Sequence, residues 1–125
     1  MHSVRLDQTK NSPEVILDPG GIIKIRGRSI LENAAEFYEP VLEWIDDYVK
    51  IPAPLTCVDI NLEYFNSATA KFLISLIQNV SAVTFRNTKI KVNWYYEDGD
   101  EDILERGEYI ESVLELDFNF IKLKS

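Results

Sequence analysis

Hydrophobic positions along the chain change their period several times, and each change marks the border of a predicted element. Short runs rich in apolar residues occupy positions 14–18 and 22–27, on either side of a Pro-Gly-Gly turn sequence at 19–21. Proline presets one turn dihedral and glycine tolerates positive φ, so these two runs predict a β-hairpin. The residues before them are mostly polar and show no clear period. We therefore expect a flexible leader over residues 1–12 and a single domain over residues 13–125.

Helical periodicity occurs in three longer segments. The first, residues 34–50, follows Asn33 and has a glutamate three residues after it, which is the spacing of a capping box. Pro40 removes a backbone donor from this helix, so we expect a kink or irregular first turns. The second segment, residues 68–85, carries a broad apolar stripe that consists of Thr69, Phe72, Leu73, Leu76, Ile77, Val80 and Val83. The third segment, residues 100–114, begins with acidic residues that suit the positive end of a helix dipole.

Strict alternation predicts a strand over residues 55–65, and alternation resumes over residues 89–96. Residues 118–123 are predicted to form a last strand. The apolar face of the first of these strands consists of Val58, Ile60, Leu62 and Tyr64. The opposite face of the predicted sheet is polar, and its residues are Lys24, Arg26, Asp59, Asn61, Glu63, Lys91 and Asn93. Strands buried on both sides are continuously apolar, so we expect the polar columns to pair across strands on an open face.

The order of the predicted elements is β-β-α-β-α-β-α-β, which places a helix between successive later strands. Right-handed crossovers make strands connected in this way parallel. The sequence therefore predicts an α/β fold with a single sheet, in which an N-terminal hairpin precedes mainly parallel strands and the helices lie mainly on one face.

The charge balance narrows the range of partners. Among 125 residues, 13 lysines and arginines oppose 21 aspartates and glutamates, which gives a net charge of -8. This sign disfavours nucleic acid and anionic membrane surfaces as partners. No apolar run approaches the ~20 residues of a membrane span, and no secretory signal is recognisable, so we expect a cytoplasmic protein. The single cysteine, Cys57, excludes an intramolecular disulfide, and its strand pattern predicts a buried small hydrophobe.

Few side chains are suited to catalysis. The single histidine, His2, lies in the expected leader, so the domain lacks the most common general base and metal ligand. We expect no cofactor, because no glycine-rich phosphate loop is present. An acidic cluster fits a helix start better than a metal site; its members are Glu97, Asp98, Asp100, Glu101 and Asp102. The sequence thus predicts a protein without enzymatic activity, and an enzyme that uses only carboxylates and lysine is the remaining alternative.

The most informative stretch is YFNSATAK, residues 64–71, where a strand delivers the chain to the start of a helix. We expect Asn66 to cap this helix and Thr69 to lie on its buried stripe, which leaves the Ser67 hydroxyl facing solvent. A phosphate on Ser67 would place a charge of about −1.5 to −2 beside the N–H groups of the helix N-terminus. Local chemistry leaves both a plain cap and a phosphorylation switch open. The residues of a predicted partner-docking surface on the same helix are Ala70, Lys71, Ile74 and Gln78.

Several segments resemble a known group of bacterial regulators. They are the Gly-x-Ser-x-x-Glu-Asn segment at residues 27–33, the helix that contains Trp44, the Leu-Glu-Tyr-Phe-Asn-Ser junction at residues 62–67 with Lys71, and the Trp-Tyr-Tyr run at residues 94–96. The order of elements and the serine at the junction are similar to those of the STAS domain of anti-sigma factor antagonists. The closer resemblance is to the SiaC family of regulatory phosphoproteins, and it covers nearly the whole chain.

This resemblance implies a STAS-like fold and a regulatory circuit. In SiaC-like proteins the residue after the junction asparagine is a threonine that a cognate Ser/Thr kinase phosphorylates and a PP2C-type phosphatase clears. The unmodified protein binds and stimulates a diguanylate cyclase. Carried over, the acceptor is Ser67, and Thr69 is the second candidate. Asn66 and Ala70 depart from the aspartate and glycine of the STAS motif, which disfavours a sigma-factor circuit.

Two hypotheses follow. The leading one is a non-enzymatic signalling adaptor that regulates a partner such as a diguanylate cyclase in cyclic-di-GMP signalling and is switched by phosphorylation of Ser67. The alternative is a domain that binds a small anion or another ligand on its polar sheet face or at the helix N-terminus. Changes at Lys24, Arg26 or Lys91 would abolish such binding, whereas Ser67→Ala would not.

Overall fold

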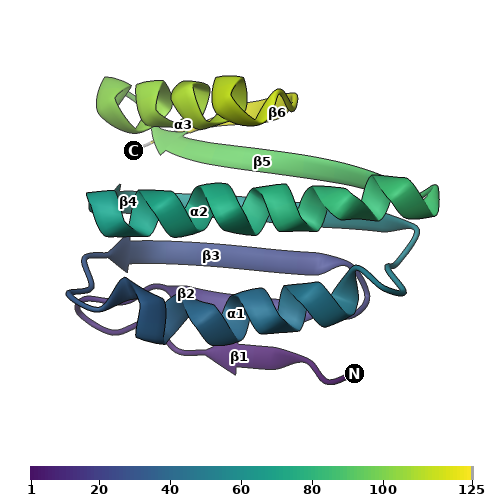
Figure 1. The fold of residues 1–125 in the computed structure, drawn as a ribbon. Coiled ribbons are helices and arrows are strands. Elements are labelled where there is room, and N and C mark those ends of the chain that lie inside the picture. Colours follow the sequence, from purple (N-terminus) through teal and green to yellow (C-terminus); the bar gives the residue numbers. More distant parts are fainter. Residues whose placement is uncertain (125) are drawn as a thin grey trace.

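The computed structural model describes residues 1–124, which form one six-stranded sheet and three α-helices (Figure 1). The strands are β1 (Val4–Leu6), β2 (Glu14–Asp18), β3 (Ile22–Ser29), β4 (Leu55–Phe65), β5 (Lys89–Glu97) and β6 (Phe118–Leu123). The helices are α1 (Ala34–Tyr48), α2 (Ser67–Val80), which continues into the 3₁₀ turn η1 (Ser81–Arg86), and α3 (Glu101–Leu114).

The strands lie in the sheet in their sequence order. Pairing is antiparallel from β1 through β3 and parallel from β3 through β6. The predicted α/β fold, an N-terminal hairpin followed by parallel strands, is therefore confirmed.

All three helices lie on one face of the sheet (Figure 1). Each helix connects two neighbouring parallel strands, and the strand order advances in a single direction from β3 to β6. Because crossovers of this kind are right-handed, successive connections in one direction place every helix on the same side. Within residues 1–124 the other face carries no helix, which agrees with the polar residues along its strands.

Close packing of α3 on β5 depends on a position without a side chain. Trp94 is 1% exposed, and its Nε1 donates a hydrogen bond to the carbonyl oxygen of Ile103 at 3.0 Å. A Cβ atom on Gly107 of α3 would lie 2.5 Å from the Trp94 ring. The indole thus fills the space that a side chain at position 107 would take, and α3 approaches the sheet closely.

The first residues differ from the expected leader. Val4–Leu6 forms β1, which pairs with β2 at the edge of the sheet. The carbonyl oxygen of His2 accepts a hydrogen bond from Nε1 of Trp44 at 2.9 Å, and the hydroxyls of Thr9 and Ser12 lie 2.6 Å apart. A three-residue strand contains too little alternation to be recognised in the sequence. This part of the chain is therefore an element of the sheet, and the domain begins before residue 13.

Strand β4 departs from strict alternation near its end. Its register with β3 shifts between Leu62 and Tyr64, which makes Glu63 the extra residue of a β-bulge. The bulge turns Tyr64 outward, where it is 46% exposed, and turns Phe65 into the core, where it is 0% exposed. The prediction that Tyr64 faces the core is wrong, because a bulge exchanges the two faces of a strand without changing its residue pattern.

Two helices also differ in detail from the prediction. α1 contains Pro40 and ends at Tyr48, whereas a helix to residue 50 was expected. α2 ends at Val80, and the chain continues as a 3₁₀ turn where a single helix was expected.

By length and composition alone, Ser67–Arg86 would suffice to cross a membrane. In this fold the segment is a core helix, because the residues of α2 with no exposed surface include Leu73, Leu76, Ile77 and Val80.

Candidate functional site

Asn66 holds the junction between β4 and α2. Its Oδ1 accepts a hydrogen bond from the backbone N–H of Thr69 at 3.0 Å, and its Nδ2 donates to the carbonyl oxygen of Leu31 at 3.1 Å. Its backbone N–H donates to the carbonyl oxygen of Ser29, also at 3.1 Å. Asn66 is therefore the N-cap of α2, and its side chain also ties the start of this helix to the loop that follows β3.

Thr69 lies beneath the junction in a buried network of hydroxyl groups. Its Oγ1 lies 2.7 Å from Oγ of Ser29 and donates to the Ser29 carbonyl oxygen at 3.2 Å. The Ser29 hydroxyl also lies 2.8 Å from the hydroxyl of Tyr38, and all three residues are 0% exposed. Burial raises the pKa of Tyr38 to about 12, against the opposing effect of its hydrogen bonds with Ser29 and Thr69. A kinase would reach the Thr69 hydroxyl only after local unfolding, so its surroundings fit an anchor.

Ser67 has the opposite surroundings. It is the first residue of α2, its side chain is exposed, and no acidic residue stands in the first turn of this helix. The first N–H groups of a helix have no intrahelical partner and carry a partial positive charge. Negative charge on Ser67 is therefore compatible with the fold.

An open hollow of about 310 Å³ lies between α2 and α3, and Ser67 forms part of its wall. Two of the predicted docking residues, Ala70 and Ile74, line the hollow beside Ser67, whereas Lys71 and Gln78 are exposed on α2 outside it. The remaining residues of the wall are Phe65, Asp102, Glu105, Arg106, Tyr109 and Ile110.

Arg106 of α3 is the residue of this site that sequence reasoning missed. Its Nη1 donates to the carbonyl oxygen of Phe65 at 2.6 Å, and its guanidinium carbon lies 3.9 Å from the centroid of the Phe65 ring. The ring of Tyr64 is also near, at 5.9 Å. The cation therefore reaches from α3 to the last residue of β4, two residues before Ser67. The available signal in the sequence was that Arg106 is the single basic residue within the acidic stretch 97–111.

The polar face of the sheet holds the site of the alternative hypothesis. Burial raises the pKa of Tyr95 on this face, and the Asp59 carboxylate adds to the effect. A hollow of about 210 Å³ on this face has a wall that consists of Lys24, Arg26, Asp59, Asn61 and Tyr95. Lys91, which was expected to take part in ligand binding, does not line this hollow.

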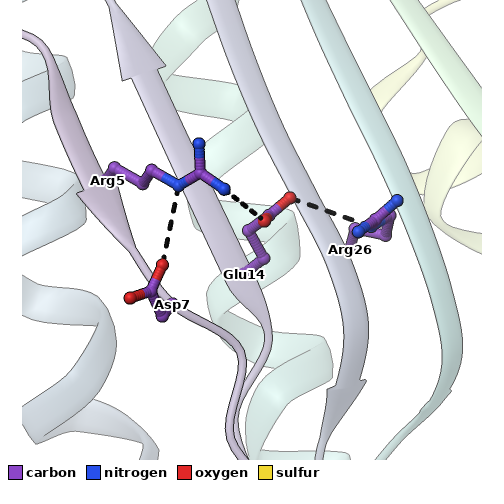
Figure 2. A network of polar contacts seen from close by, with 4 residues as sticks. All are labelled: Arg5, Asp7, Glu14 and Arg26. Carbon is purple, nitrogen blue, oxygen red and sulfur yellow. Dashed lines mark hydrogen bonds and ion pairs between the residues drawn. The ribbon is translucent and has the colours of Figure 1, made fainter.

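Many polar groups of this face pair with one another. Asp59 accepts a hydrogen bond from Nδ2 of Asn93 at 2.7 Å. Glu14 lies 3.3 Å from Nη2 of Arg5 and 3.7 Å from Nε of Arg26, so one carboxylate bridges two strands that flank its own (Figure 2). The expected pairing across strands is present, and it gives these residues a structural role without a ligand.

Two other candidates for chemistry have structural explanations. Asp100 caps α3, since its Oδ1 accepts the backbone N–H of Ile103 at 3.1 Å. No group of three or more histidine, cysteine, aspartate or glutamate residues among residues 1–124 is placed to hold a metal ion. Cys57 is half-buried instead of fully buried, because it lies on the face of the sheet that carries no helix.

The described residues form a small α/β domain with a one-sided sheet and an exposed hydroxyl at a capped helix start. A family model described as SiaC family regulatory phosphoprotein matches residues 6–123. The chain therefore belongs to the SiaC family, whose members are non-enzymatic regulators.

Solved structures support the fold. Apo-SiaC from Pseudomonas aeruginosa superposes with a TM-score of 0.83 at 19% sequence identity, over 98% of each chain. A crystal structure of the diguanylate cyclase SiaD in complex with its activator SiaC, from the same organism, contains a chain that superposes with a TM-score of 0.84 at 19% identity. That superposition covers 98% of this chain and 99% of the other. No curated protein matches the sequence significantly.

Proposed function

We propose that this protein is a phosphorylation-controlled adaptor that, in its unmodified form, docks on a diguanylate cyclase and regulates it. Ser67 is the acceptor, and its phosphorylation blocks the contact. The observation that carries the proposal is the contrast between two neighbouring hydroxyls in a regulatory phosphoprotein. Ser67 is exposed on the first residue of α2, whereas Thr69 is 0% exposed and hydrogen-bonded.

The physical basis of the switch is charge placed on a docking surface. Ala70 and Ile74 offer apolar contacts beside Ser67, and Lys71 and Gln78 extend the exposed surface along α2. A phosphate would bring about −1.5 to −2 charges to this surface, so a partner seated on it would have to desolvate or neutralise them. Within the protein the same charge lies at the favourable end of the helix dipole. Modification therefore changes binding without unfolding the domain.

The partners follow from this mechanism and from the relatives. A diguanylate cyclase is the proposed target because SiaC of Pseudomonas aeruginosa activates the cyclase SiaD. A reversible switch also requires a Ser/Thr protein kinase and a phosphatase, for which a PP2C-type enzyme is our proposal. The proposed location is the cytoplasm, where ATP and the nucleotide substrate of a cyclase are available.

The test uses the purified protein, its kinase and its cyclase. After incubation with the kinase and ATP, mass spectrometry is expected to find the phosphate on Ser67, and the product should bind the cyclase more weakly than the unmodified protein. Ser67→Ala should bind the cyclase like wild type but resist the kinase, whereas Ser75→Ala, a control on the same helix, should retain both properties. Phosphate on another residue, or equal cyclase binding by both forms, would contradict the proposal.

A further inference from the structure

The hollow between α2 and α3 contains a cation without an anionic partner. Arg106 is half-buried, and in the described part of the chain it forms no ion pair with a carboxylate. Asp102 and Glu105 line the same hollow, yet the guanidinium binds the neutral carbonyl of Phe65 and lies over its ring. A charge of this kind, held in place by uncharged groups, remains available to an anion.

We propose that Arg106 is the phosphate-binding residue of the modified protein, which pairs with phosphoserine at position 67 across the hollow. This inference rests on the proposed function, because it requires a phosphate on Ser67. Arginine binds phosphate through a planar fork of N–H donors, often with two hydrogen bonds at once. The carbonyl oxygen of Phe65 accepts from Nη1, and the structure gives the rest of the fork no other partner among the described residues.

The arrangement of the chain brings the two groups into the same space. The guanidinium already contacts Phe65, which precedes Ser67 by two residues, and both side chains line one hollow of about 310 Å³. Phosphorylation lengthens the Ser67 side chain and adds several acceptor oxygens. The new pair would therefore join two side chains that already line the same hollow.

Pairing would change the surface of the hollow as well as its charge. A phosphate bound to Arg106 would connect α2 to α3 and occupy the end of the hollow beside Ser67. A partner that docks on the hollow would then lose access to that end as well as meet a new charge. Asp102 and Glu105 act against this pairing because they repel a phosphate, so the contribution of Arg106 has to be measured directly.

The test measures the second pKa of the phosphate by ³¹P NMR in full-length protein that carries phosphoserine at position 67, incorporated during translation. An adjacent guanidinium stabilises the dianion, so this pKa should lie below the ordinary value of about 6. Arg106→Gln is expected to raise it by about one pH unit. Lys71 lies one helical turn after Ser67 and is close enough to lower the same pKa, so the control is Lys89→Gln, which removes an exposed charge beside Leu55 at the other end of β4 and should leave the pKa unchanged.

Equal phosphate pKa values in wild type and in folded Arg106→Gln would overturn the inference, and so would equal shifts in Arg106→Gln and Lys89→Gln. If Arg106→Gln does not fold, Arg106→Met takes its place, because it also removes the charge and keeps an unbranched side chain, and an unchanged pKa would again refute the pairing. Incorporation during translation separates this result from the proposed function. A kinase that ignores Ser67 would refute the function alone, whereas a modified protein that no longer binds the cyclase, with a pKa insensitive to Arg106, would refute the pairing alone.

Discussion

Replacement of Thr69 by valine tests the anchor beneath the helix start. The substitution keeps the shape of the side chain and removes its contacts with Oγ of Ser29 at 2.7 Å and with the Ser29 carbonyl oxygen at 3.2 Å. In the variant, Oγ of Ser29 keeps its hydrogen bond with the hydroxyl of Tyr38. The Ser29 carbonyl oxygen still accepts a hydrogen bond from the backbone N–H of Asn66. No polar group of the network is left buried without a partner, so the cost is that of the lost hydrogen bonds.

The expected magnitude follows from these contacts. Two hydrogen bonds at about 0.5–1.5 kcal/mol each, offset by about 0.8 kcal/mol for the additional buried methyl group, give a net destabilisation of roughly 0.2–2.2 kcal/mol, centred on about 1 kcal/mol. Thr69→Ala also removes the existing methyl group and leaves a small cavity, so its cost should reach about 2–3 kcal/mol. Ser67→Ala is the matched control, because Ser67 is exposed, and its effect should stay within about 0.5 kcal/mol.

Urea unfolding followed by circular dichroism measures these differences as shifts of the midpoint at constant m value. The same variants are then treated with the kinase, and folded Thr69→Val should still acquire its phosphate on Ser67. Wild-type stability in Thr69→Val would refute the anchoring role of the network. Loss of phosphorylation in the folded variant would instead identify Thr69 as the acceptor and refute the division of roles at the junction.

Three further predictions concern the rest of the domain. Gly107→Ala should lower the free energy of unfolding by roughly 2 kcal/mol, because the new Cβ would lie 2.5 Å from Trp94, and an unfolding midpoint equal to that of the exposed control Glu108→Ala would contradict this. Tyr38 ionises at a pKa of 10.0 when unfolded and about 12 when folded, so stability should fall between these pH values as the unfolded state alone loses its proton. Between these pH values, the free energy of unfolding from urea titrations should fall with pH by about 1.4 kcal/mol per pH unit more in wild type than in Tyr38→Phe. Equal pH dependences in the two proteins would refute the shift. Lys24→Ala should leave cyclase binding unchanged. If this variant no longer binds the cyclase in a binding assay, the polar face of the sheet takes part in binding.

The fold could be predicted where elements are long and one face is buried. The eleven residues of β4 and the stripe of α2 show clear periods, and the alternation of helices with strands determines parallel pairing. Two features depend on tertiary contacts instead. β1 has three residues and is stabilised by its pairing with β2, and the bulge at Glu63 is a change of backbone register that leaves no mark in the hydrophobic pattern.

The candidate site also has a part that the sequence predicts and a part that depends on tertiary contacts. The places of Asn66, Ser67 and Thr69 follow from local rules, because a cap and a helical stripe are defined within a few residues. Arg106 reaches Phe65 across 41 positions of sequence, and its place depends on how α3 packs against the end of β4. Local rules cannot supply such a contact, and a lone arginine in an acidic stretch indicates only that some contact is to be expected.

The bulge, the cap and the buried network together explain why the proposed phosphate on Ser67 would cost the fold little. The bulge at Glu63 turns Phe65 inward, where its ring and carbonyl hold Arg106. Asn66 and Thr69 meet the structural needs of the helix start, so the Ser67 side chain has no hydrogen-bond partner among residues 1–124. A hydroxyl with a structural role would lose that role when phosphorylated, and the domain would lose stability. Because the neighbours of Ser67 carry the structural contacts, a phosphate on Ser67 would break no hydrogen bond of the helix start.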